Sequence, residues 1–343
     1  MYSFHGLSDR GEMMKRTEVL TATESILKDA GFQVSERCAA RPSCFDIVAR
    51  REGQLTLMKM YANIGNVSIE DASELQTISE CLSATPFFIC NENRGKPLED
   101  DTIYSRYNIC TMTLKTLEDV ALHEMYPLIE AGPGGYYVRL DGKRIRQRRQ
   151  KLGFSIGKLA DMVGISRRTL YGYEKDMAKA SVSVAYNLEW ILGVPVVKSI
   201  DIFQSNAQND GFLATAKRII IGHHFLQKVL KQFTQINFRV AHTKRAPFDF
   251  IAQSRDESLN VIGGVPTEKE RNIDQRMNEI VSISKIVNAQ PVFITDGQQI
   301  PNNNISLINH KDFENLRHPE EFISKLDDMS KYRSTEAFGY RRR

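Results

Sequence analysis

The chain has 343 residues, of which 41% are hydrophobic and 26% are charged, and its formal net charge at pH 7 is +4. This length suits two or three domains, and this composition excludes fibrous and intrinsically disordered proteins. Because no apolar run reaches the roughly 20 residues that cross a bilayer and the first residues lack the pattern of a signal peptide, we expect a cytoplasmic protein with no membrane partner.

The segment 15–130 has the order of helices and strands that is typical of a small α/β domain. An amphipathic helix is expected at 19–29, a polar helix at 69–82 and a fully apolar strand at 86–90. Short runs rich in Val, Ile and Phe lie between the helices and are typical of strands. Strands that alternate with helices favour an α/β fold.

Two strand-like runs in this segment carry one acidic and one basic residue that are candidates for a nuclease site. Asp46 begins DIVAR, and Lys59 lies near the end of QLTLMKMY. The layout resembles PD-(D/E)xK nucleases, in which an aspartate and the acid of a (D/E)xK triplet hold a metal ion. The residue two before Lys59 is Leu57, which can neither bind metal nor polarise water. The sequence therefore predicts a degenerate, restriction-endonuclease-like domain without a metal site.

The middle segment, residues 131–203, is expected to be a separate domain. The sequences AGPGGYYV at 131–138 and QSNAQNDG at 204–211 are interpreted as hinges, because Gly, Pro, Asn and Ser interrupt regular structure. Between 141 and 180, eleven Lys or Arg residues stand against four Asp or Glu. Such a basic segment suits the docking of a polyanion, although charge alone favours the alternative of a solvated helical face.

The basic segment contains the pattern of two short helices joined by a tight turn. Ser155 and Ser166 occupy the N-cap positions of helices expected at 156–162 and 167–174. Gly164 supplies the left-handed backbone that a tight turn between helices requires.

Through SIGKLADMVGISRRTLYGYE at 155–174 the segment resembles the Cro and lambda-repressor type of helix-turn-helix. The resemblance implies an all-α domain whose helix at 167–174 enters the major groove of double-stranded DNA. The residues expected to face base edges are Arg167, Arg168 and Tyr171. The residues expected near phosphates or at the helix starts are Ser155, Lys158, Ser166, Thr169 and Lys175. The alternative for the two arginines is an exposed face that merely contacts solvent.

The same resemblance predicts an ion pair between Arg149 and Glu174 that fixes the orientation of the two helices. It also shows a departure at Asp176, where the family commonly has glycine, so the exit from the second helix is expected to differ. Because one such helix covers only a few base pairs, a homodimer is expected.

The segment 212–330 repeats the order of 15–130. FDIVA at 45–49 reappears as FDFIA at 248–252, and ISECLSATPFFIC at 78–90 is echoed by ISKIVNAQPVFIT at 283–295. The corresponding helices are expected at 216–233 and 272–287, and the corresponding strand at 291–295. We infer two copies of one α/β domain on either side of the helix-turn-helix.

The second copy keeps an aspartate, Asp249, but its next strand reads LNVIGG. Aligned with the first copy, this sequence places Val261 at the position of the acid and Gly263 at that of the lysine. No catalytic residue is therefore assigned, and a structural role for both aspartates is favoured. The five cysteines are scattered without a CxxC pair, so no zinc site is indicated.

Over most of its length the chain resembles archaeal HTH-type transcriptional regulators, through FDIVAR, LSATPFFI, AGPGGYYV, SRRTLYGYE and RAPFDF. The resemblance implies a sequence-specific DNA-binding regulator that is not an enzyme and needs no cofactor. The alternatives are a metal-dependent DNA nuclease targeted by the helix-turn-helix, and a non-catalytic assembly module. No sequence feature identifies a small-molecule effector.

Overall fold

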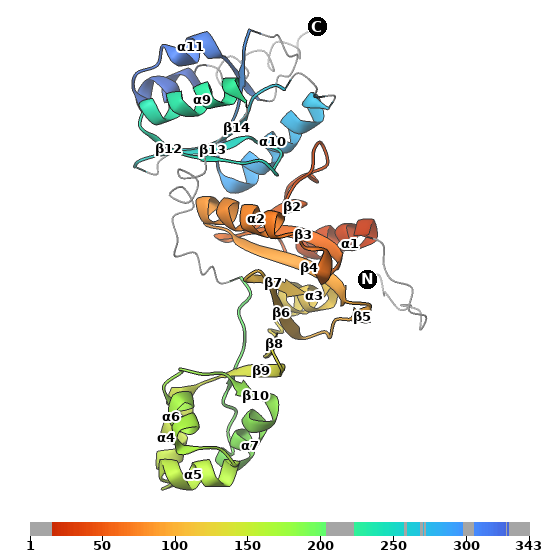
Figure 1. Ribbon diagram of the computed structural model, residues 1–343, viewed down its shortest axis with the longest axis vertical. Coiled ribbons are helices and arrows are strands. Elements are labelled where there is room, and N and C mark those ends of the chain that lie inside the picture. Colours follow the sequence, from red (N-terminus) through yellow and green to blue (C-terminus); the bar gives the residue numbers. More distant parts are fainter. Residues whose placement is uncertain are drawn as a thin grey trace. The chain divides into compact units, whose positions relative to one another are not determined.

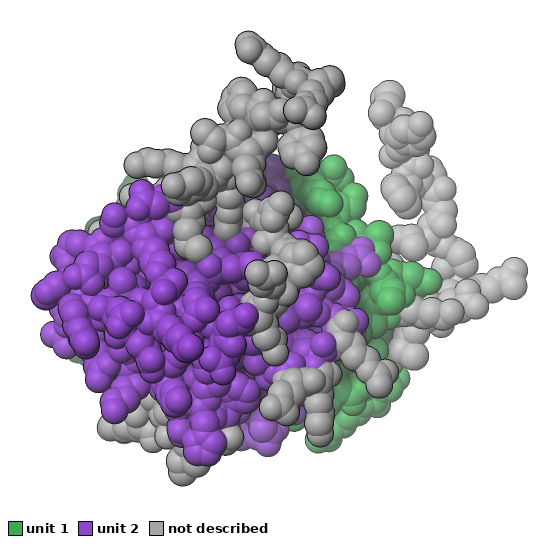
Figure 2. Space-filling model, turned by 90° about the horizontal axis from the view of Figure 1, so that it is seen from above, with its two compact units in different colours: residues 1–30, 60–67, 88–202 green, residues 31–59, 68–87, 203–343 purple. Residues whose placement is uncertain are grey.

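The computed structural model describes residues 16–203, 223–256, 259–267, 270, 272–297, 305–326 and 328 (Figure 1). Two compact units are distinguished by colour in Figure 2; the first comprises residues 1–30, 60–67 and 88–202, and the second comprises residues 31–59, 68–87 and 203–343. The strands β3 (Gln54–Asn63) and β4 (Thr85–Asn93) continue from one unit into the other. Helices and sheets together confirm the predicted mixed α/β class. None of the helices in these residues is long and apolar enough to span a membrane.

The first unit contains two helices that pack against each other, α1 (Arg16–Asp29) and α3 (Leu114–His123). The buried face of α1 has the spacing of an amphipathic helix and is formed by Val19, Leu20, Thr23, Ile26 and Leu27. This helix confirms the one predicted at 19–29.

Short strands accompany these helices. Strand β6 (Thr102–Arg106) pairs antiparallel with β7 (Ile109–Met112), and β5 (Lys96–Pro97) pairs with β4. The turn between β6 and β7 has positive φ at Tyr107 and Asn108, the geometry that matches the twist of a two-residue hairpin.

A β-hairpin occupies the segment that was predicted to be a hinge. Strands β8 (Ile129–Gly132) and β9 (Gly135–Leu140) pair antiparallel, with Gly132 opposite Gly135. Gly134 has a φ of 84°, so the glycines here form a tight turn rather than an interruption. The hinge prediction for 131–138 is therefore wrong, whereas the one at 204–211 lies outside the described residues.

The helix-turn-helix domain consists mainly of four helices, α4 (Gly142–Lys151), α5 (Ile156–Val163), α6 (Arg167–Glu174) and α7 (Val182–Leu192). The short strands β10 (Ala180–Ser181) and β11 (Val197–Lys198) both pair with β9. The helices share a core in which Ile145, Leu159, Leu170 and Leu188 are fully buried.

In the second unit, β1 (Gln33–Val34), β2 (Ile47–Arg51) and the first part of β3 form an antiparallel ladder. Helix α2 (Ile69–Leu82) has the bounds that the sequence predicts. Ser68 caps it, because its side chain accepts a hydrogen bond from the backbone N–H of Asp71 at 3.0 Å.

The same unit contains a five-stranded sheet in the order β12 (Phe238–His242), β13 (Phe250–Ser254), β14 (Asn260–Gly264), β15 (Gln290–Thr295), β16 (Ser306–Asn309). The first three strands are antiparallel and the last three are parallel. Strand β15 agrees with the apolar strand predicted at 291–295.

Helices cover both faces of this sheet. Helix α9 (His224–Gln235) packs through Phe233 against Phe250, near α11 (His310–Glu314), whereas α10 (Ile273–Val287) places Arg276 over Phe293 on the other face. Helix α10 agrees with the helix predicted at 272–287. Part of the helix predicted at 216–233 lies outside the described residues.

Candidate nucleic-acid interface

The two helices of the motif begin at side-chain caps. The Ser155 hydroxyl accepts a hydrogen bond from the N–H of Lys158 at 3.1 Å, and the Ser166 hydroxyl accepts one from the N–H of Thr169 at 3.0 Å. Each cap occupies one backbone donor that the first helical turn leaves free. The starts of α5 and α6 are thus fixed by residues next to them in sequence.

The turn between α5 and α6 is tight. Gly164 has a φ of 80°, and its N–H and that of Ile165 both donate to the carbonyl of Ala160, each at 3.0 Å. Ala160 itself is fully buried in the domain core. A small buried residue and a left-handed glycine together set how α6 leaves α5.

Arg149 of α4 and Glu174 at the end of α6 form a two-pronged ion pair. The Arg149 Nε lies 2.5 Å from Glu174 Oε1, and its Nη2 lies 3.0 Å from Oε2. Both residues are buried, and Arg149 Nη1 also donates to the carbonyl of Phe154. The hydrogen bond with Glu174 raises the pKa of Arg149 above its ordinary value. Such a pair fixes the orientation of α6 relative to α4.

The exit from α6 keeps the conformation that glycine would favour. Asp176 has a φ of 56°, in the left-handed region. Its Oδ1 accepts a hydrogen bond from the N–H of Gly142 at 3.1 Å and lies 3.2 Å from the Lys198 ammonium. The expectation of a different exit at this position is therefore wrong, because these contacts hold an aspartate in the left-handed region.

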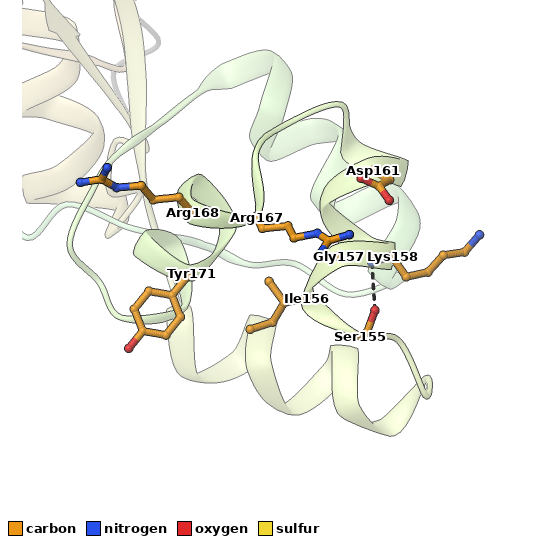
Figure 3. Close-up of a pocket in the computed structure, with 8 residues that line it drawn as sticks. All are labelled: Ser155, Ile156, Gly157, Lys158, Asp161, Arg167, Arg168 and Tyr171. Atoms are coloured by element: carbon orange, nitrogen blue, oxygen red, sulfur yellow. Dashed lines mark hydrogen bonds between the residues drawn. The ribbon is translucent and has the colours of Figure 1, made fainter.

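A shallow hollow lies between the N-terminal ends of α5 and α6 (Figure 3). The residues that line it are Ser155, Ile156, Gly157, Lys158, Asp161, Arg167, Arg168 and Tyr171. Five of these were assigned from the sequence to DNA contact. Of the three other assigned residues, Ser166 and Lys175 are exposed and Thr169 is half-buried.

The two arginines leave α6 in different directions (Figure 3). Arg167 extends toward α5, where a Cβ on Gly157 would lie only 2.8 Å from its Nε. Arg168 extends away from α5, and the ring of Tyr171 is half exposed, with the Lys175 ammonium 5.8 Å from its centre. One side chain therefore lies along the neighbouring helix while the other projects freely.

Outside the motif, the first strand-end aspartate is bound by a lysine. The Lys59 Nζ lies 2.9 Å from Asp46 Oδ1 and donates to the carbonyl of Ser43 at 2.6 Å. Asp46 and Leu57 are both buried. The two residues form a buried ion pair between the position just before β2 and the middle of β3.

The second aspartate, Asp249, is bound by two arginines. Its Oδ2 lies 2.5 Å from Nη2 of Arg276, and its Oδ1 lies 2.9 Å from Nη1 of Arg41. The N–H of Val265 donates to Oδ2 at 2.8 Å. Burial raises the pKa of Asp249, but these three contacts outweigh burial and hold its pKa below the ordinary 3.8.

Strand pairing corrects which residues of the two segments correspond. The N–H of Asp46 donates to the carbonyl of Met58, and the N–H of Asp249 donates to that of Gly263. The counterparts of Leu57 and Lys59 are therefore Ile262 and Gly264, and the assignment to Val261 and Gly263 is wrong by one position. Since side chains alternate along a strand, that single step moves them to the other face of the sheet.

Arg276 supplies the positive charge beside Asp249, as Lys59 does beside Asp46. A Cβ on Gly264 would lie 2.7 Å from Nη2 of Arg276. The guanidinium of α10 therefore fills the space above the strand position that carries Lys59 in the first segment. Arg276 is fully buried and also bonds Glu270 and the carbonyls of Pro247 and Val265.

Comparison with known proteins assigns both kinds of domain. A family model described as "PD-(D/E)XK superfamily domain" matches residues 16–127, and one described as "Helix-turn-helix" matches residues 145–198. No solved structure matches the chain.

A protein of Methanosarcina acetivorans is 32% identical over 88% of this chain and 94% of its own length. Proteins of Methanocaldococcus jannaschii and Pyrococcus furiosus are each 30% identical, over 92% and 82% of this chain and 98% and 87% of their own lengths. All three are provisionally named HTH-type transcriptional regulatory proteins. The chain belongs to this archaeal family.

In the part of the chain that the structure describes, the residues around Asp46 and Asp249 do not form the set of oxygen ligands that a divalent metal ion prefers. The described residues contain no group of three or more His, Cys, Asp or Glu side chains that could hold a metal. In the first segment Leu57 occupies the place of the second carboxylate, and in the second segment two guanidinium groups bind Asp249. Neither donor set fits a divalent cation, which prefers several oxygen ligands.

The sequence did not indicate two of the residues that shape these sites. Gly157 looked like an ordinary helical residue, because its importance depends on the direction of the Arg167 side chain. Arg276 lies 27 positions from Asp249, in a helix that the sequence predicts as polar and for which it indicates no ion pair. The available signals were a glycine in the first turn of α5 and an arginine on the buried face of α10.

Proposed function

We propose that the protein is a sequence-specific DNA-binding transcriptional regulator whose helix α6 enters the major groove of double-stranded DNA. The names of its relatives and the helix-turn-helix match support this assignment. The hollow between α5 and α6 is the part of the chain that meets the DNA.

The observation that carries the proposal is the position of three cations. Lys158, Arg167 and Arg168 lie in the first turns of α5 and α6, and neither first turn contains an acidic residue. The helix dipole disfavours cations at this end. Among the described residues none of the three side chains forms an ion pair or hydrogen bond. The arrangement suits an external polyanion better than it suits the isolated fold.

Arg167, Arg168 and Tyr171 are the base-reading residues in this proposal. A guanidinium can donate to O6 and N7 of guanine together, and such a contact discriminates against a wrong base by ~1–3 kcal/mol. The buried pair of Arg149 with Glu174 supports the reading by holding α6 in one orientation.

Ser155, Lys158, Thr169 and Lys175 contact phosphates, with Ser166 as the cap of α6. Phosphate contacts fix the register of the protein on the duplex without reading its sequence. They also make affinity depend on salt, since each neutralised phosphate adds ~0.9 to the logarithmic slope.

The protein acts as a homodimer, because a single α6 helix covers too few base pairs for a unique site. Two copies related by a twofold axis would read two half-sites about one turn of DNA apart. Sedimentation of the full chain with and without DNA tests this point.

The function is tested by a mobility-shift titration of the wild type, Arg167→Ala and Arg168→Ala on a duplex selected from a randomised library, with random-sequence competitor. We expect each variant to lose about 5- to 150-fold in preference, the equivalent of one bidentate contact. If both variants keep the wild-type preference, the base-reading assignment is wrong.

The second candidate is a metal-dependent nuclease, which the PD-(D/E)XK match and the contact between Asp46 and Lys59 favour. Incubation with duplex, forked and junction DNA in Mg²⁺ or Mn²⁺ separates it from a regulator. We expect no cleavage, because Leu57 replaces a metal ligand. Cleavage that disappears in Asp46→Ala would establish the nuclease.

A further inference from the structure

The side chain of Arg167 lies against a glycine of the neighbouring helix. A Cβ on Gly157 would lie 2.8 Å from Arg167 Nε, 3.0 Å from Cζ and 3.1 Å from Nη2. All three distances are shorter than the ~3.5–4.0 Å at which such atoms normally touch. The guanidinium therefore occupies the space that any other residue at 157 would fill.

Among the described residues, no ion pair or hydrogen bond holds the guanidinium in this place. The first turn of α5 carries partial positive charge, and among the described residues Arg167 has no hydrogen-bond or ion-pair partner. Contact with the bare backbone at Gly157 orients the side chain and leaves all five N–H donors available. A hydrogen-bond acceptor on DNA would satisfy them.

We propose that Gly157 is a specificity-determining residue, because the space beside it holds Arg167 in the direction from which that arginine reads its base pair. The inference rests on the proposed function and assigns Gly157 a positioning role, without a DNA contact of its own. The inference also gives Arg167 and Arg168 different behaviour on binding. Arg167 is pre-oriented and loses less rotamer freedom on binding, whereas Arg168 projects away from α5 (Figure 3).

The test is a base-preference profile of the full-length protein on a library of duplexes with a randomised segment. The variants are Gly157→Ala, Gly157→Leu, Arg167→Ala and the double variant Gly157→Ala with Arg167→Ala. Arg167→Ala should lose roughly 5- to 150-fold discrimination at the base pair that Arg167 reads. Gly157→Ala should lose part of that discrimination at the same base pair, and Gly157→Leu should lose more.

The double variant decides whether Gly157 acts through Arg167. If Gly157 acts through Arg167, Gly157→Ala changes the base-preference profile when Arg167 is present but has no effect in the Arg167→Ala background. An equal change in both backgrounds, or a wild-type profile for both Gly157 variants, overturns the inference. If Arg167→Ala itself keeps the wild-type profile, the proposed base reading fails as well, so the two failures are distinguishable.

Thermal unfolding distinguishes a loss of stability from a change in the direction of the Arg167 side chain. Gly172→Ala is the matched control for stability, since its Cβ would meet no atom within 4 Å and alanine favours a helix. Gly157→Ala should melt no lower than the wild type, because only the far end of a flexible side chain must move. A changed profile together with unchanged melting supports positioning; a lowered melting temperature with uniformly weak binding contradicts it.

Discussion

Glu74 and Glu279 make reciprocal contacts: each accepts hydrogen bonds from two consecutive backbone N–H groups of the segment that contains the other glutamate. The Oε1 of Glu74 accepts hydrogen bonds from the consecutive N–H groups of Lys244 and Arg245, at 2.5 and 3.3 Å. The Oε1 of Glu279 accepts them from Ala39 and Ala40, at 2.9 and 2.8 Å.

Each of these residues lies 205 positions from its counterpart. The rings of Phe45 and Phe248, which the sequence aligns with each other, meet at 6.2 Å. Such reciprocity is what a twofold rotation between two like domains would produce. The internal repeat stays a prediction that these contacts favour.

Replacing either glutamate with alanine should destabilise the protein, because two backbone donors lose a charged acceptor. We expect about 1 kcal/mol for Glu74→Ala and about 2–3 kcal/mol for Glu279→Ala, since Glu279 is buried whereas Glu74 is partly solvated. Denaturant unfolding measures both. Lys285→Ala, on the exposed side of α10, is the control and should change stability by less than about 0.5 kcal/mol. Equal values for Glu279→Ala and the control would contradict the expectation.

Asp249→Asn should cost about 3–5 kcal/mol, because it leaves Arg276 and Arg41 without their buried counter-charge. The folded-state pKa of Asp249 lies below 3.8, so its contribution is complete above that pH and is lost as pH falls through the folded pKa. Urea unfolding from pH 7 into this acidic range should therefore show a smaller loss of stability for the asparagine variant. Parallel curves for both proteins would show that the carboxylate makes no such contribution.

Arg149→Met should destabilise the helix-turn-helix domain by about 3–5 kcal/mol, since it leaves Glu174 buried and unpaired. Replacing both partners with apolar residues should restore much of that loss, whereas Arg149→Lys should not, because lysine cannot make the two-pronged contact. Thermal unfolding and DNA affinity are the readouts, and Lys151→Ala on the exposed side of α4 is the control. If the Arg149→Met protein is as stable as the wild type and binds DNA equally well, the pair of Arg149 and Glu174 does not orient α6.

Lys158→Ala should lower the salt dependence of DNA binding by ~0.9 in logarithmic slope and leave base preference unchanged, as expected for one phosphate contact. Arg168→Ala should instead reduce preference at one base pair. Binding titrations at several salt concentrations test the difference. Lys28→Ala in α1 is the control for an exposed lysine outside the motif, and a loss of base preference in Lys158→Ala would show that Lys158 reads a base.

The sequence predicted the features that depend on neighbouring residues. The caps at Ser155 and Ser166 and the turn at Gly164 are set within four positions, so both ends of α5 and the start of α6 follow from local patterns. The polar helices predicted at 69–82 and 272–287 likewise agree with α2 and α10.

Features that need distant residues to meet could not be predicted in the same way. Arg41 reaches Asp249 across 208 positions, and the strand register near Gly264 differs by one residue from the sequence alignment. The glycines at 132–135 were compatible with either a hinge or a hairpin, and only strand pairing decides between them. The direction of Arg167 depends on a rotamer that no spacing rule specifies.

Arg276 makes a metal site of the PD-(D/E)xK type hard to introduce in the second segment. A lysine at 264 would need the volume that Arg276 fills, and Arg276 is fixed by Asp249, Glu270 and two carbonyl groups. An acid at 262 would enter a fully buried position. Such a site would therefore require coordinated substitutions of Ile262, Gly264 and Arg276, so no single mutation can create it.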